Sequence, residues 1–165
     1  MTGLLPLQPI GEADRPAVLA LNNAHAAELS WLEPETLSKL LDEAFHARRI
    51  GAAEAFLVTF DQDADYDSPN FQWFRRRYPR FVYIDRVAAA AGARGRGHAR
   101  RLYEDLFARA AAAGHTLVTC EVNADPPNPA SDAFHAALGF GEVGTAAIHG
   151  GAKTVRYYAK SLAGR

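Results

Sequence analysis

The sequence predicts a single domain, residues 1–165, of the α/β class, in which helices flank a mixed and mostly antiparallel sheet. Its 165 residues suffice for one hydrophobic core and are too few for two ordinary domains. Hydrophobic residues make up 48% and charged residues 22% of the chain, which is typical of a folded soluble protein. Strand-like and helix-like segments alternate, and one strand, helix, strand series within 81–122 requires a parallel pair of strands.

The N-terminal third predicts one short strand followed by helices. The segment at 4–10 is apolar and interrupted by prolines, which favours an edge strand. Pro16 stands where the first turn of a helix tolerates proline, and apolar residues follow it at helical spacing. A second helix is expected to start at Glu33 or Pro34, because apolar residues recur three and four positions apart after it. We therefore expect helices to occupy residues 14–48.

The rest of the chain predicts five more strands and two helices around one long loop. Strands are expected at 55–61, 81–91, 116–122, 141–149 and 153–162, and helices at 98–113 and 130–138. Residues 62–79 form the longest irregular stretch. Loops of this length in compact domains usually carry function.

Charge and cysteine content limit the classes of partner. The formal net charge is −1, which argues against a protein-wide attraction to nucleic acid or to an anionic membrane. The one cysteine, Cys120, excludes an internal disulfide, and its alternation with two valines indicates a buried position. The first ten residues have neither a basic segment nor an apolar stretch long enough for export or spanning, so a cytoplasmic protein without membrane contact is expected.

Two local patterns, an acidic series at 61–67 and an arginine-rich segment at 75–80, resemble binding motifs. Acidic residues alternate from Asp61 to Asp67 as in a calcium loop, but Tyr66 replaces the glycine that such a loop needs, and the six histidines lack ligand spacing. No metal site is therefore expected. The arginine-rich segment at 75–80 is interpreted as a solvated loop or the rim of a cofactor site, with RNA binding as the alternative.

The segment RGRGHA, at 94–99, predicts a phosphate-binding turn. The first turn of the expected helix at 98–113 leaves backbone N–H groups without partners and carries the positive end of the helix dipole. Gly95 and Gly97 let a ligand approach the backbone closely. Arg94 and Arg96 add positive charge that pairs with phosphate oxygens.

Two well-known phosphate-binding motifs fit this turn poorly. A Walker-type loop ends in Gly-Lys followed by Ser or Thr, and this ending is absent. A dinucleotide-binding turn has a third glycine where close packing of helix on strand leaves no room for a side chain. Arg100 occupies that position here.

Three segments in register resemble the GCN5-related N-acetyltransferase (GNAT) superfamily. Residues 94–99 are similar to its signature (Gln/Arg)-x-x-Gly-x-(Gly/Ala), and a strand containing Val87, Ala88 and Ala89 precedes them at the family's spacing. The segment from Asn128 to Phe140 is similar to the family's Asn-x-x-Ala-x-x-Phe-Tyr-x-x-x-Gly-Phe. The resemblance implies a GNAT-type domain with a splayed parallel strand pair that transfers acetyl from acetyl-CoA to a primary amine in a ternary complex. It also makes a homodimer plausible.

The resemblance also implies where the donor binds. The amides of the glycine turn would bind the pyrophosphate, and the strand before it would pair with the pantetheine arm as with an added strand. The residues implied in acetyl-CoA binding are Val87, Ala88, Ala89, Arg94, Gly95, Arg96, Gly97, His98, Ala99, Asn128, Ser131 and His135. His135 stands where many members have a tyrosine proposed to protonate the departing thiolate. It is either that acid or a neutral packing contact.

The acceptor side depends on polar residues inside expected strands. Charged residues there are costly unless paired or facing a wet groove, so Asp85 and Glu121 are candidates for proton removal from the amine. Positions 83, 85 and 87 are expected on one strand face, and 119, 121 and 123 on one face of the other strand. The residues expected to line the acceptor groove are Tyr83, Asp85, Glu121 and Asn123, and the N–H of Ala89 is the candidate donor to the oxyanion.

Two alternatives stay open at this level. The strand carboxylates could instead form ion pairs, for instance with Arg86 or Arg101. The chain could also be a non-catalytic CoA-binding or RNA-associated module on the same fold, which the missing tyrosine at position 135 favours. The acceptor itself is not specified by the sequence.

Overall fold

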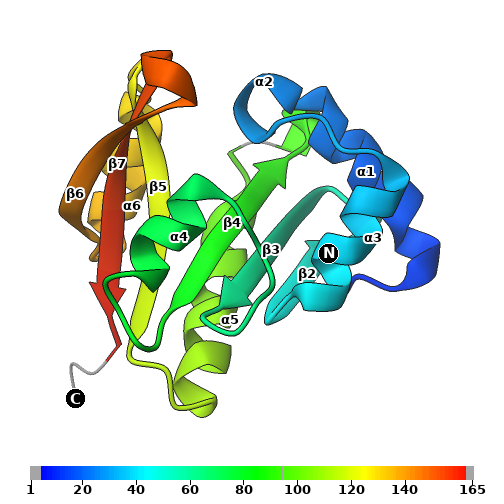
Figure 1. Ribbon diagram of the computed structural model, residues 1–165. Coiled ribbons are helices and arrows are strands. Elements are labelled where there is room, and N and C mark those ends of the chain that lie inside the picture. The colour runs from blue at the N-terminus through cyan, green and yellow to red at the C-terminus, as the bar shows by residue number, and fades with distance from the viewer. Residues whose placement is uncertain (1–4, 94, 163–165) are drawn as a thin grey trace.

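The computed structural model describes residues 5–93 and 95–162. Within them, a seven-stranded sheet in the order β1-β2-β3-β4-β5-β7-β6 is covered by helices on both faces (Figure 1). The strands are β1 (Leu7–Pro9), β2 (His46–Ile50), β3 (Ala55–Asp61), β4 (Val82–Ala89), β5 (Leu117–Asp125), β6 (Gly141–Ile148) and β7 (Lys153–Ser161). The α-helices are α1 (Arg15–Ala24), α2 (Ala26–Leu29), α3 (Pro34–Glu43), α4 (Pro69–Arg75), α5 (His98–Ala112) and α6 (Pro129–Ala137). The predicted α/β class with a mixed, mostly antiparallel sheet is confirmed, since only β4 and β5 pair in parallel.

Two hydrophobic clusters lie on opposite faces of the sheet. One packs α1, α3 and α4 against the sheet and contains Phe71 and Phe74 of α4. The other packs α5 against the sheet and contains Leu102 and Leu106. These leucines belong to the apolar stripe that predicts the helix from the sequence. The sheet is therefore buried on both faces, which leaves polar side chains inside it in need of partners.

The parallel strands β4 and β5 separate soon after they pair. Their register contains only Val82 opposite Val118 and Tyr83 opposite Thr119. Beyond these pairs the two strands diverge toward the end of the molecule where α2 lies (Figure 1). From residue 84 onward, β4 has β3 on one side and no described strand on the other. The expected splayed pair is thus present, and backbone groups of β4 are left for another partner.

Two elements correct the expectations from sequence. Residues 46–50 form β2, not the end of a helix, because α3 ends at Glu43 and β2 pairs along its whole length with β3. Three of the five residues in the segment HARRI are polar, so it lacks the clear alternation of apolar and polar residues that predicts a strand. Within the expected loop at 62–79, α4 forms with Ser68 as its N-cap, whose hydroxyl accepts from the N–H of Phe71, and with Pro69 in its first turn.

A β-bulge at Asp85 corrects the expectation that positions 83, 85 and 87 share one face. The register between β3 and β4 skips Asp85. Before the bulge, Tyr83 packs in the cluster under α4 and Ile84 in the cluster under α5. After it, Ala88 packs under α4 while Val87 packs on the α5 side. One inserted residue reverses the alternation of a strand, so Val87 faces away from Tyr83.

Replacing Gly144 with alanine is expected to lower the free energy of unfolding by about 2 kcal/mol. A Cβ at Gly144 would lie 2.7 Å from Cη2 of Trp73 and closer still to Cζ2. The indole cannot easily move, because it stacks on Tyr157 with 4.2 Å between ring centroids. Chemical denaturation measures the effect. Gly141→Ala, in the same strand with nothing within 4 Å of its Cβ, is the matched control, and equal losses in both variants would rule out the steric cause.

Candidate active site

A cavity of about 560 Å³ lies where β4 and β5 separate. Its walls come from the strands β4, β5, β6 and β7, from α2, α4, α5 and α6, and from the segments around Ser30, Tyr66 and His149. Eight residues predicted from the sequence line it: Tyr83, Asp85, Val87, Glu121, Asn123, Asn128, Ser131 and His135. Seven other residues predicted from the sequence are not part of its lining: Ala88, Ala89, Gly95, Arg96, Gly97, His98 and Ala99. Arg94 lies outside the described residues.

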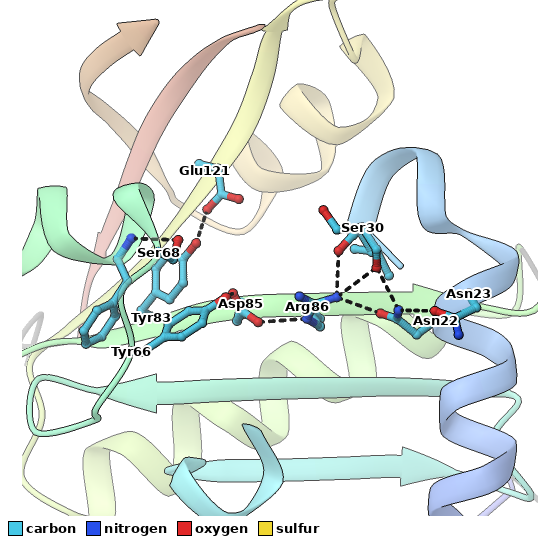
Figure 2. A network of polar contacts seen from close by, with 11 residues as sticks. Asn22, Asn23, Ser30, Tyr66, Ser68, Tyr83, Asp85, Arg86 and Glu121 are labelled. Atoms are coloured by element: carbon cyan, nitrogen blue, oxygen red, sulfur yellow. Dashed lines mark hydrogen bonds and ion pairs between the residues drawn. The ribbon is translucent and has the colours of Figure 1, made fainter. Parts of the chain in front are cut away.

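Glu121 and Tyr83 join the two diverging strands at the base of the cavity. The Tyr83 hydroxyl donates to Oε1 of Glu121 at 2.6 Å (Figure 2). Burial raises the pKa of Glu121 to about 8, although the hydrogen bond from Tyr83 opposes the shift. Burial likewise raises the pKa of Tyr83 well above its ordinary value, so the phenol stays protonated. Glu121 is therefore a carboxyl group that changes its charge just above neutral pH, as a base for an amine requires.

Asp85 is held by partners on both oxygens. Tyr66 donates to Oδ1 at 2.7 Å and Nε of Arg86 donates to Oδ2 at 2.9 Å. Consecutive side chains of a regular strand point to opposite faces, and the bulge is what lets these two neighbours meet. Burial raises the pKa of Asp85, while the guanidinium of Arg86 acts against the rise. The structure thus contains the ion pair between Asp85 and Arg86 that was the alternative interpretation of Asp85.

Arg86 connects β4 to the segment around α2. Its Nη1 donates to Oδ1 of Asn22 at 2.9 Å and to the carbonyl of Leu29 at 2.6 Å. Figure 2 shows this network running from Tyr66 and Asp85 to Ser30 and α1, apart from the contact between Tyr83 and Glu121. Arg86 therefore fixes the end of α2, which forms one wall of the cavity.

His135 is buried and bonded through both ring nitrogens. Nδ1 lies 2.7 Å from the carbonyl of Ser131, which only accepts, so Nδ1 carries the proton of the neutral ring. Nε2 lies 2.8 Å from the hydroxyl of Tyr103, which then donates to it. Burial lowers the pKa of His135, which favours this neutral form. The one N–H of the neutral ring is already bonded to Ser131, so His135 has no N–H left to offer to a ligand. Tyr103, its other partner, also lines the cavity.

The glycine turn has the backbone that its sequence predicts. Gly95 and Gly97 have φ values of +81° and +77°, and an added Cβ would meet nothing within 4 Å at either one. Gly97 is the N-cap of α5 and has no side chain that could cap the helix. The N–H groups in the first turn of α5 are therefore left to donate to a ligand. The side chain of His98 turns inward and is 7% exposed, with no partner for either ring nitrogen among the described residues. The turn therefore offers main-chain donors around open space.

Asn128 has a local structural role as well as a place in the cavity wall. It is the N-cap of α6, where its Oδ1 accepts from the N–H of Ser131 at 3.2 Å, and Pro129 follows in the first turn. This cap directs Ser131 and His135, which are four residues apart, toward the cavity.

Sequence reasoning missed most of the other residues of the cavity wall, among them Tyr66, Tyr103 and Lys153. Tyr103 is four residues after Ala99 and so falls on the buried stripe of α5, where a phenol needs a partner. Lys153 falls two residues before buried Val155, so the alternation of β7 could have indicated that it faces inward. Tyr66 carries no such signal, because it lies in an irregular segment.

Two properties hold for the described part of the chain. No helix in residues 5–93 and 95–162 is long and apolar enough to cross a membrane. In the same residues, no three or more His, Cys, Asp or Glu side chains gather in a way that could hold a metal ion.

The model of one protein family matches this chain. It is the model of the acetyltransferase (GNAT) family, and it covers residues 47–140, which is more than half of the sequence. The match includes the glycine turn, both diverging strands and α6. A search of curated protein sequences finds no match.

Solved structures of similar fold include several acetyltransferases. The ribosomal-protein-S18-alanine N-acetyltransferase from Escherichia coli has a TM-score of 0.71 at 18% identity, covering 95% of this chain and 93% of that one. The ribosomal-protein-alanine N-acetyltransferase from Brucella melitensis has 0.73 at 21%, covering 95% and 99%. The putative acetyltransferase yncA from Salmonella typhimurium, solved with its cofactor acetyl-CoA, has 0.74 at 14%, covering 97% and 95%. At these identities the structures agree in fold, and the family model decides the assignment: this chain belongs to the acetyltransferase (GNAT) family.

Proposed function

We propose that the protein transfers an acetyl group from acetyl-CoA to a primary amine by direct attack in a ternary complex. The observation that carries this proposal is the cavity between β4 and β5, where Glu121, with its pKa of about 8, lies within the same lining as His135 and Tyr103. Glu121 is the candidate base for the amine, and Tyr103 with His135 is the candidate donor for the departing sulfur.

The chain has room and donors for the donor substrate. Acetyl-CoA supplies a thioester whose acyl carbon an amine can attack. The open backbone at Gly95 and Gly97 and the free amides at the start of α5 suit a diphosphate, with Arg96 exposed beside them. The unpaired edge of β4, including Val87 and Ala89, suits an amide-rich arm, and the N–H of Ala89 is proposed to donate to the acyl oxygen.

Glu121 is proposed to take the proton from the attacking amine. Its carboxyl becomes a carboxylate as the pH rises through about 8, while the hydroxyl of Tyr83 stays in contact at 2.6 Å. Asp85 is assigned a different part in the same site, because both of its oxygens are occupied. It holds Tyr66 at the cavity wall, and Asn123 completes the polar lining on the β5 side.

His135 is proposed to act through Tyr103. In the neutral imidazole, Nε2 accepts from the hydroxyl of Tyr103 and fixes the position of the phenol. The phenolic O–H is proposed to turn from Nε2 to the departing sulfur and to stabilise the thiolate by a hydrogen bond, while the proton of the amine passes to Glu121. The 2.8 Å contact between Tyr103 and His135 supports this pair as the counterpart of a single tyrosine acid.

The test is release of free thiol from acetyl-CoA in the presence of amines, amino acids, polyamines and peptides. Acceptor-dependent release is expected with at least one class. If the purified, folded protein binds coenzyme A but releases no thiol with any acceptor, the non-catalytic alternative replaces the enzyme. If it retains RNA in a manner that depends on the arginines at 75–77, and does not bind coenzyme A, the donor site itself is disproved.

A further inference from the structure

Lys153 places a positive charge on the same side of the sheet as Glu121. It is the first residue of β7 and lines the cavity. Alternate residues of a strand share a face, so Lys153 projects on the face of Val155 and Tyr157, each 1% exposed. Tyr157 lies opposite Glu121 in the register of β5 and β7. The ammonium group and the proposed base are therefore on one wall of one cavity.

The ammonium group of Lys153 has no direct hydrogen-bond or ion-pair partner in the part of the chain that the structure describes, although its charge acts on Glu121. No ion pair or hydrogen bond joins it to residues 5–93 or 95–162. The other strongly basic side chain of the lining, Arg86, is occupied by Asp85, Asn22 and two backbone carbonyls. The carboxylates of the lining are Asp85, which pairs with Arg86, Glu121, which accepts from Tyr83, and Glu28 of α2. A half-buried cation that lines a cavity and makes no ion pair or hydrogen bond there is placed to bind an anionic group of a ligand.

The lysine and the base lie within electrostatic reach of each other. Burial is the main cause that raises the pKa of Glu121, and the positive charge of Lys153 is among the influences that oppose the rise. No direct ion pair forms between them within the described residues, although both line the same cavity.

We propose that the acceptor is an amino acid, bound with its amine at Glu121 and its carboxylate at Lys153. This inference rests on the proposed acetyl transfer and specifies its acceptor. A free amino acid carries the carboxylate that the lysine lacks. A peptide has a neutral amide in the place of that carboxylate, and a polyamine has a second cation, which the lysine repels.

The experiment compares acids with their own amides as acceptors. Thiol release from acetyl-CoA is measured for the L-α-amino acids, β-alanine and 4-aminobutyrate, and for the matching carboxamides. At least one acid is expected to have a kcat/KM at least tenfold above that of its amide. Lys153→Met is expected to reduce this ratio at least tenfold, mainly through KM for the acid. Lys39→Met, on the exposed side of α3, is the matched control and leaves the ratio unchanged.

Each other outcome contradicts the inference in a distinguishable way. If amides, peptides or polyamines are acetylated as well as the acids or better, the acceptor class is wrong while acetyl transfer stands. The same holds if Lys153→Met keeps the preference for the acids. If no amine of any kind releases thiol although coenzyme A binds in calorimetry, the proposed function fails first, and the inference fails with it.

Discussion

Replacing Glu121 with glutamine is expected to lower kcat for acetyl transfer by about a hundredfold or more, the range typical of a lost general base. Glutamine keeps the size of the side chain. In the wild-type protein the Tyr83 hydroxyl donates to Oε1 of Glu121 at 2.6 Å, and Oε1 of a glutamine can accept the same hydrogen bond. It cannot take a proton from the amine. Steady-state kinetics measures the change, with Glu104→Gln on the exposed surface of α5 as the control of equal chemistry. An unchanged kcat would exclude Glu121 as the base.

The pH profile identifies the titrating group. In the wild-type protein, kcat/KM is expected to rise as the pH increases through about 8, where Glu121 loses its proton. The acceptor used should have an amine that is already neutral at pH 6, so that only the protein titrates. Glu121→Gln is expected to show a flat profile in this range. A rise that persists in the variant would assign it to another group.

The same carboxyl makes an independent prediction for stability. The pKa of Glu121 is raised from the ordinary 4.5 to about 8 in the folded protein, so between these values the folded chain binds more protons than the unfolded chain. The contribution of this group to the free energy of unfolding therefore decreases as the pH rises from 4.5 to about 8. The Tm of Glu121→Gln relative to wild type is expected to increase between pH 5 and pH 8, measured by calorimetry.

Replacing Gly97 with alanine is expected to raise the Kd for coenzyme A at least tenfold, or about 1.4 kcal/mol. The open space at Gly97, where an added Cβ meets nothing within 4 Å, is where the diphosphate is proposed to lie. The methyl group would also strain a backbone with φ of +77° and shift the first amides of α5. Isothermal calorimetry measures the affinity without any need to know the acceptor.

Gly114→Ala separates ligand contact from backbone strain. Gly114 follows the other end of α5, has φ of +85°, and its added Cβ would make only an ordinary contact with Arg80, at 3.7 Å. Both variants should lose about 1 kcal/mol of folding free energy from the left-handed backbone. Only Gly97→Ala should weaken coenzyme A. An equal loss of affinity in the two variants would mean that strain, not contact, is responsible.

The sequence by itself determined the features that arise from local rules. The glycines before α5 have the positive φ that their position predicts, because a helix start with Gly at its N-cap depends on a few neighbouring residues. Asn128 and Pro129 likewise begin α6 as a local cap and first turn. The parallel strands and the apolar stripe of α5 follow from periodicity. These features carried the family resemblance, which the family model confirms for residues 47–140.

Only the tertiary structure decided the arrangement of the polar groups. Strand β2 exists because β3 pairs with it, and its own sequence has no clear alternation. The bulge at Asp85 is set by the register of β3 and β4, so side-chain direction after it could not be read from spacing. The contacts of Tyr103 with His135 and of Tyr83 with Glu121 join residues 32 and 38 positions apart. Such contacts, and the burial that sets their pKa values, depend on packing between elements, which local sequence patterns do not contain.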